Sequence, residues 1–426
     1  MNNKTLVVGL LIFGLLITAL VARSGDIAWM ALPFLAYMGV GLLQAPPTEK
    51  LHLSAVRSLE QSRSNGSSSV DVSLNIQNQS AETLQLALHE TAPAGTQVTD
   101  GQLSRRMVLC PGESAEMKYS FTVLRGNFTW ESLQTVVSDP LGLIETRIFL
   151  PASAELQIRP QIKKFKAIQF RPHSTLHSPG SIPARLGGSG TDFFGIREYH
   201  SGDPLRSLDW RLTARHPHKF FTKEFEQEEI AEIGFILDAR QQTDLRIGEE
   251  SLFESSLGAT ASLSEMFLHQ GHRVSLLVFG EKMSNVFPGY GKLQLQRIMS
   301  CLSRTKVSAE NRSVASLSYL PIRMFPSRAL VIVISSLTST DKSLFLRLRA
   351  SGYQVLLISP NPLDFAYPLL PQDETLQRAV RATRLERRLR LKDIAQLQIQ
   401  VIDWQVKQPL FPLVRNALSN SRGQQK

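Results

Sequence analysis

The chain has 426 residues, of which 42% are hydrophobic and 20% charged, and it carries a formal net charge of +10. This length predicts two or three folded domains, and the composition excludes a chain that is disordered throughout. The positive charge suits an anionic membrane surface or an acidic partner. Nucleic acid is not expected as a partner, because the sequence lacks zinc-finger spacing and the aromatic signatures of RNA-binding domains.

Two uncharged hydrophobic runs lie near the N-terminus, Thr5–Ala22 and Ile27–Leu43. A helix over the first run would span roughly 27 Å, which is close to the hydrocarbon thickness of a bilayer. Residues 1–48 are therefore predicted to form a transmembrane helical hairpin, with helices at about 5–22 and 27–43. The alternative is a cleaved signal peptide, but the first run is long for one and a second run follows at once.

The basic residues around the hairpin predict its orientation. Lys4 precedes the first run, and Lys50, Arg57 and Arg63 follow the second, so the positive-inside rule places both ends in the cytoplasm. Arg23, in the turn between the runs, opposes this orientation weakly. We expect a multi-pass protein of the inner (plasma) membrane, with the lipid bilayer as one partner and the soluble domains cytoplasmic.

Residues 49–160 change to a period of two, which is typical of half-buried strands. The clearest case is Val70–Ile76, and similar segments are Leu84–Leu88, Glu116–Val123, Phe128–Val137 and Leu156–Ile158. Turn residues separate these segments, whereas the serine-rich stretch Ser62–Ser69 predicts a loop. The pattern favours an all-β immunoglobulin-like sandwich. Cys110 and Cys301 lie far apart, so free thiols are expected.

Residues 161–230 show weak periodicity and predict an irregular connector. Residues 231–426 then alternate at the scale of βα units and predict a Rossmann-like α/β domain with a parallel sheet covered on both faces. In such sheets, ligands bind at the carboxyl ends of the strands. The expected strands are 232–237, 273–279, 329–334, 353–358 and 398–404, and the expected helices are 251–269, 292–302, one from about 342, and 374–396.

A long motif lies in the connector, Gly195–Glu226, and includes the stretch Gly202-Asp-Pro-Leu-Arg-Ser-Leu-Asp-Trp210. It resembles the signature of the bacterial family called domain of unknown function 58 (DUF58). Helical spacing would put Asp203, Arg206 and Asp209 on one face, where the arginine could bridge the carboxylates. The signature is either a structural network of buried ion pairs that fixes the connector to the α/β domain or a surface that docks a partner. The candidate residues are Arg197, Tyr199, Gly202, Asp203, Arg206, Asp209, Trp210 and Arg215.

The resemblance also implies that the α/β domain is similar to von Willebrand factor A domains, which often hold a divalent metal on an Asp-x-Ser-x-Ser motif. Asp238 matches the first position, but Arg240 and Gln242 replace both serines. Ser335 stands where the pattern expects an aspartate. We expect a vestigial site at Asp238 and Ser335 that holds no metal, and no other cofactor.

The sequence contains neither a phosphate-binding GxxxxGK[ST] loop nor a nucleophile placed next to a base, so a non-enzymatic protein is expected. The resemblance implies a MoxR-type AAA-plus ATPase as partner. The predicted function is a membrane-anchored binding or scaffold protein that helps such an ATPase to assemble or mature other proteins. The alternatives are a metal-dependent adhesion-like ligand-binding protein at the cell envelope and a hydrolase that uses the signature residues. Seven basic residues between Arg378 and Lys392 predict a solvated helix face or a contact with anionic headgroups.

Overall fold

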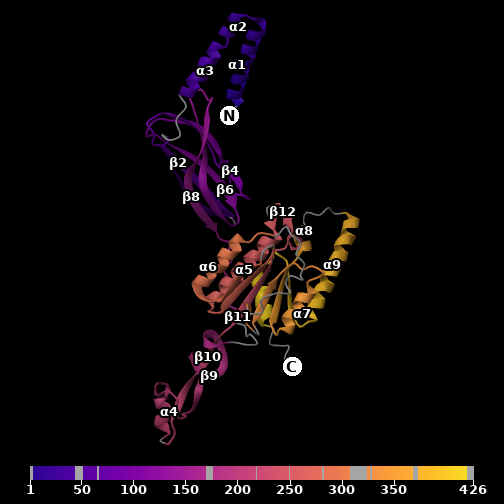
Figure 1. Cartoon of the computed structure of the whole chain (residues 1–426). Coiled ribbons are helices and arrows are strands. Elements are labelled where there is room, and N and C mark those ends of the chain that lie inside the picture. The colour runs from indigo at the N-terminus through magenta and orange to yellow at the C-terminus, as the bar shows by residue number, and fades with distance from the viewer. Residues whose placement is uncertain are drawn as a thin grey trace. The chain divides into compact units, whose positions relative to one another are not determined.

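The computed structural model describes residues 3–43, 51–64, 67–168, 176–216, 218–248, 250–280, 283–307, 324–326, 329–367 and 373–419. The chain divides into two compact units, Met1–Ile158 and Arg159–Lys426 (Figure 1). Within the described residues, one hydrophobic core cluster lies in the first unit and two lie in the second.

Three helices begin the first unit: α1 (Asn3–Ala22), α2 (Gly25–Trp29) and α3 (Leu32–Leu43). The segments Lys4–Ala22 and Gly25–Leu43 each have 19 residues and are long and apolar enough to cross a membrane. The second expected helix is interrupted at Met30 and Ala31, which lie between α2 and α3. Proline explains the break, because Pro33 has no N–H to donate to the Trp29 carbonyl and is tolerated only in the first turn of a helix.

Two four-stranded antiparallel sheets form the rest of this unit. One has the order β1 (Leu53–Ser64), β2 (Ser67–Asn78), β6 (Ser114–Val123), β4 (Gln97–Gly101), and the other β5 (Ser104–Leu109), β3 (Leu84–His89), β7 (Gly126–Ser138), β8 (Glu145–Ile158). Both sheets contribute to a single core, so they pack face to face. The loop expected at Ser62–Ser69 is wrong at both ends. β1 extends to Ser64 and β2 begins at Ser67, and these two residues pair with each other.

A buried ion pair joins the two sheets. Arg57 on β1 donates from Nη2 to Glu90 Oε2 at 2.7 Å, and its guanidinium lies 5.5 Å from the ring centre of Trp130. Burial raises the pKa of Glu90, and the neighbouring guanidinium opposes that shift. Arg57 therefore has a structural role within the β-sheet unit.

The second unit contains a six-stranded sheet with the order β15–β14–β11–β16–β17–β18. Five strands are parallel, as expected from their continuous hydrophobic runs: β11 (Glu232–Asp238), β14 (Arg273–Phe279), β16 (Leu330–Ile334), β17 (Gln354–Pro360) and β18 (Gln400–Trp404). The sheet is mixed rather than all-parallel, because β15 (Ser284–Gly289) pairs antiparallel with β14 at one edge.

Helices cover both faces of this sheet, and alternate residues of each strand enter two separate cores. One core joins Phe235 and Ile332 to α5 (Leu252–His269), α6 (Gly291–Arg304) and α10 (Leu410–Ser419). The other joins Ile236 and Val333 to α7 (Lys342–Ala350) and α9 (Glu374–Ala395). Short elements complete the α/β domain of this unit: η3 (Gln241–Thr243), β12 (Arg246–Ile247), β13 (Glu250–Ser251) and α8 (Pro362–Ala366).

The expected irregular connector is wrong for most of its described length. Residues 161–168 lie extended along the α/β domain, where Lys163 N donates to Ser262 Oγ at 2.9 Å and Gln270 Nε2 donates to the Ile168 carbonyl at 3.0 Å. A two-stranded antiparallel ribbon follows, formed by β9 (Leu176–Glu198) and β10 (Phe221–Ile230). Between them lie η2 (Leu205–Ser207) and α4 (Trp210–Arg215), at the end of the ribbon (Figure 1). Glycine, proline and three register shifts hide this ribbon from a period-two search.

Candidate functional site

The end of the ribbon, residues 197–224, is called the tip below, and an ion network defines its shape. Arg197 donates to both carboxylate oxygens of Asp203, at 2.7 and 2.8 Å, and from Nε to Glu224 Oε1 at 2.7 Å. Hydrogen bonds from Arg197 and from the backbone of His200 lower the pKa of Asp203 to about 2. The network ties the end of β9 to the following turn and to the start of β10.

The turn and the short helix of the tip depend on two other signature residues. Gly202 has φ of +112°, a conformation that favours glycine. Asp209 caps the N-terminus of α4, where its Oδ1 accepts a hydrogen bond from Leu212 N at 3.0 Å, and this bond is the main cause that lowers its pKa. The expected Arg206 bridge is wrong. Asp203 pairs with Arg197, and the cation near Asp209 is Lys223, at 3.8 Å.

Three large apolar side chains of the tip point into solvent. The exposed fractions are 68% for Leu205, 65% for Trp210 and 58% for Phe220. Tyr199 is half-buried and packs edge-on against Phe220, with ring centres 6.4 Å apart. Because backbone pairing and polar contacts hold the tip together, these side chains are left available for contact with another molecule.

The tip is also basic. It contains six lysine or arginine residues and four aspartate or glutamate residues, a net charge of +2 with neutral histidines. Arg197 and Lys223 face carboxylates of the tip itself, whereas Arg206, Arg211 and Arg215 are exposed. The ion pairs of the tip are only partly buried and stay within the ribbon, so the expected buried network that fixes the connector to the α/β domain is not what these residues form.

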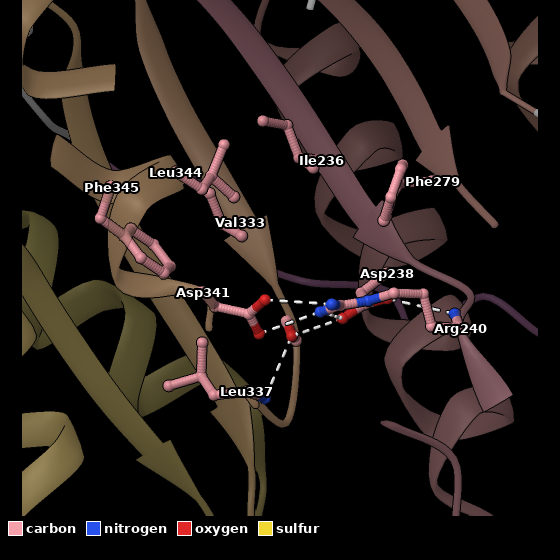
Figure 2. A pocket seen from close by; sticks show the side chains of 10 residues that line it. Ile236, Asp238, Arg240, Phe279, Val333, Leu337, Asp341, Leu344 and Phe345 are labelled. Atoms are coloured by element: carbon pink, nitrogen blue, oxygen red, sulfur yellow. Dashed lines mark hydrogen bonds and ion pairs between the residues drawn. The ribbon is translucent and has the colours of Figure 1, made fainter. Parts of the chain in front are cut away.

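A second cluster lies at the carboxyl edge of the six-stranded sheet (Figure 2). Arg240 follows β11 and lies between Asp238, at the end of that strand, and Asp341, just before α7. It donates to Asp238 from Nε at 2.9 Å and Nη2 at 2.7 Å, and to Asp341 from Nη1 at 3.0 Å and Nη2 at 2.9 Å. Each carboxylate thus receives two hydrogen bonds from one guanidinium.

Neighbouring groups fix the two carboxylates. Ser335 Oγ donates to Asp238 Oδ2 at 2.7 Å, and Thr338 N donates to Asp341 Oδ2 at 2.7 Å. The three charged side chains are each at most 5% exposed, and the guanidinium carbon lies 5.6 Å from the ring centre of Phe279. Burial alone would lower the pKa of Arg240, but the hydrogen bonds to both aspartates outweigh it and raise that pKa above its usual range.

The comparisons with known proteins cover both clusters. Residues 195–373 match the model of a family described as "Protein of unknown function DUF58". This part of the chain is therefore similar to the DUF58 family. The match begins at the first residue of the predicted signature and extends over the tip and the Arg240 cluster. The fold resemblance to von Willebrand factor A domains is not part of this finding.

One relative is "Uncharacterized protein YeaD" of Bacillus subtilis (strain 168), 27% identical over 276 residues. That alignment spans 62% of this chain and 65% of the relative, so it leaves about a third of the relative unmatched.

Two solved structures are similar to parts of the chain. A FixG-related protein from Vibrio parahaemolyticus is 13% identical, with a TM-score of 0.17, over 24% of this chain and 95% of that one. An aerotolerance-related membrane protein from Bacteroides fragilis NCTC 9343 with multiple mutations to serines is 14% identical, with a TM-score of 0.30, over 45% of this chain and 97% of that one. Scores this low carry no argument about this chain.

The Arg240 cluster does not fit the metal that the resemblance implies. Asp238 and Ser335, expected as a vestigial site, do lie together, but the carboxylate oxygens of Asp238 already accept from Arg240. Asp341 completes the cluster and was missed, because it lies 101 positions from Arg240 and six beyond Ser335. Among the described residues, no group of three histidine, cysteine, aspartate or glutamate side chains could hold a metal ion.

A second arginine closes the same edge of the α/β domain. Arg387 was expected on a helix face that is solvated or contacts anionic headgroups. It is instead buried and donates to Asp403 Oδ1 at 2.8 Å, to Ser359 Oγ at 3.0 Å and to the Ser336 carbonyl at 3.2 Å. Its helical position could have revealed this, because it shares a face with three buried apolar residues, Val380, Leu391 and Ile394. The ends of β16, β17 and β18 are thus joined by one guanidinium.

Proposed function

We propose that this chain is a non-enzymatic, membrane-anchored binding or scaffold protein, and that the tip is the surface that docks its partner. The observation that carries this proposal is the exposure of Leu205, Trp210 and Phe220 on a segment held in one shape by polar contacts. Exposing three such side chains to water does not stabilise the isolated ribbon, whereas tryptophan and arginine are among the residues that contribute most to protein interfaces.

The chemistry of the tip favours an acidic protein partner with apolar pockets. Arg206, Arg211 and Arg215 surround α4 with exposed positive charge, and Trp210 is the first residue of that helix. Complementary charge would speed association, and the aromatic anchor would supply most of the affinity. The family resemblance supplies the class of partner, a MoxR-type AAA-plus ATPase. We infer that the chain presents itself or a client to this ATPase for assembly or maturation.

The remaining parts of the proposal concern anchoring and fold. We infer that the two apolar segments tether the protein to the inner membrane as a multi-pass hairpin, with the soluble units in the cytoplasm. Their length and composition support a tether. We also infer that the two packed antiparallel sheets are immunoglobulin-like and that the six-stranded domain is von Willebrand factor A-like. The Arg240 cluster argues against the alternative of a metal-dependent adhesion protein, because a guanidinium stands between the carboxylates.

The test is co-purification from detergent extracts of cells that express the full chain. Wild type should recover an AAA-plus ATPase, and Trp210→Ala should reduce its recovery by roughly tenfold or more, as expected for an interface anchor. Phe287→Ala is the matched control, because Phe287 is also an exposed aromatic residue but lies on β15. Asp203→Ala should weaken recovery as well, by loosening the tip.

Two results would contradict the proposal. One is that wild type recovers no AAA-plus ATPase, which would remove the proposed partner class. The other is that Trp210→Ala, Asp203→Ala and Phe287→Ala all recover the same amount of ATPase as wild type, which would remove the tip as the docking surface. Recovery of other proteins counts for neither outcome.

A further inference from the structure

The carboxyl edge of the six-stranded sheet has the oxygen ligands of a cation site, and a side chain of the protein itself supplies the cation. Asp238 ends β11, whereas Ser335 and Asp341 lie at the two ends of the segment between β16 and α7. All four carboxylate oxygens accept hydrogen bonds from Arg240 (Figure 2). In open α/β sheets this edge is where ligands bind. Here the position is taken by a side chain that is nearly fully buried.

The geometry differs from that of an ordinary ion pair in three respects. The guanidinium is shared evenly between two carboxylates, one at the end of β11 and one just before α7, so it bridges them as a bound ion would. Ser335 adds a hydroxyl oxygen next to Asp238, which is the oxygen-rich chemistry that a hard divalent cation prefers. The cluster also has a net charge of −1, because two carboxylates face one guanidinium. A divalent ion in place of the guanidinium would bring the net charge to zero.

We infer that Arg240 is the resident cation of a divalent-metal type of site, so that the wild-type domain is independent of metal and removal of this one side chain creates a metal site. The ligand class of the created site is a hard divalent cation such as Mn²⁺ or Mg²⁺. Asp238, Asp341 and Ser335 are its ligands. Serine in place of Arg240 frees the space and adds one more hydroxyl oxygen. This inference is independent of the partner proposed for the tip.

The experiment measures Mn²⁺ binding to the full chain in detergent, by the loss of the free-ion signal in electron paramagnetic resonance. Arg240→Ser should bind Mn²⁺ at least about tenfold more tightly than wild type, and Arg240→Ser with Asp341→Asn should lose that gain, since affinity follows the number of charged oxygen ligands. Arg246→Ser is the matched control. Arg246 also pairs with an aspartate two positions away, Asp244 at 3.1 Å, but it is exposed. It should behave as wild type does.

Each outcome decides the question. The inference is overturned when wild type binds Mn²⁺ as tightly as Arg240→Ser, because Arg240 then does not hold the site. It is equally overturned when a folded Arg240→Ser protein, checked by near-ultraviolet circular dichroism, binds no more Mn²⁺ than Arg246→Ser. Where Arg240→Ser does not fold, Arg240→Gln replaces it, because glutamine removes the positive charge and supplies an amide oxygen that a hard cation can bind. A folded Arg240→Gln protein that binds Mn²⁺ no better than Arg246→Ser refutes the inference.

Discussion

His272 makes the stability of the α/β domain depend on pH. It lies between α5 and β14, is 1% exposed, and its ring centre is 6.2 Å from that of Phe267. Burial lowers the pKa of His272 to about 4, whereas an exposed histidine in the unfolded chain titrates near 6.5. Between these two pH values the unfolded chain binds a proton that the folded chain does not bind. The free energy of unfolding therefore decreases as the pH falls from about 6.5 towards 4.

The size of this effect follows from the two pKa values. Between pH 7 and pH 5 the proton taken up by the unfolded chain lowers the free energy of unfolding by about 2 kcal/mol. His272→Gln cannot take up that proton, so its stability should vary by about 2 kcal/mol less than that of wild type over the same range. Below pH 5 the carboxylates begin to titrate, so the comparison ends there.

The assay must report on the α/β domain alone, because the chain contains two units. Urea-dependent hydrogen exchange of peptides from β11 and β14 gives the free energy of unfolding of this domain. His269→Gln is the matched control, since His269 ends α5 and is exposed. It should keep the pH dependence of wild type. If His272→Gln keeps the same pH dependence of the free energy of unfolding as wild type, the buried ring of His272 is not the source of that dependence.

Three further predictions use the same exchange measurement. Arg240→Met should destabilise the α/β domain by about 3–5 kcal/mol, because it leaves two buried carboxylates without their cation, and a near-neutral result would contradict the geometry of the cluster. Arg387→Met should cost about 2–4 kcal/mol through the loss of hydrogen bonds to a charged donor. Its exposed neighbour offers the control Arg388→Met, which should stay within about 0.5 kcal/mol of wild type. Gly202→Ala should cost about 1–3 kcal/mol of local stability from backbone strain. Exchange should rise in the tip and stay unchanged in β11.

The strands that could be predicted have a clear hydrophobic pattern. A strand buried on both faces is a continuous apolar run, and a strand buried on one face alternates apolar and polar residues. β11, β14, β16 and β17 stand out because each contains a run of apolar residues, and β2 stands out because it alternates. β18 includes Asp403, but it has Val401, Ile402 and Trp404. β15 was missed because Ser284–Gly289 contains Pro288 and little hydrophobic surface, as an edge strand can. β1 was missed in the same way, since serine and charged residues interrupt its pattern.

The candidate site shows a different limit. The signature could be located from the spacing of its residues, but its ion partners could not be assigned. The spacing of Asp203 and Arg206 would suit one face of a helix. The structure instead has a turn at Gly202 that brings Arg197 and Asp203 together. The pairing of Arg240 with Asp341 depends on two strands lying side by side in the sheet. Contacts of that kind are set by topology, which spacing along the chain does not report.

The ion pairs around Arg240 have a consequence for the surroundings in which the protein can work. Arg240 is a covalent part of the chain, so every molecule carries this positive charge. A chelator, a competing ion or a change in metal supply cannot remove it. The edge of the sheet beside Asp238 is therefore the same in metal-starved and metal-replete cells.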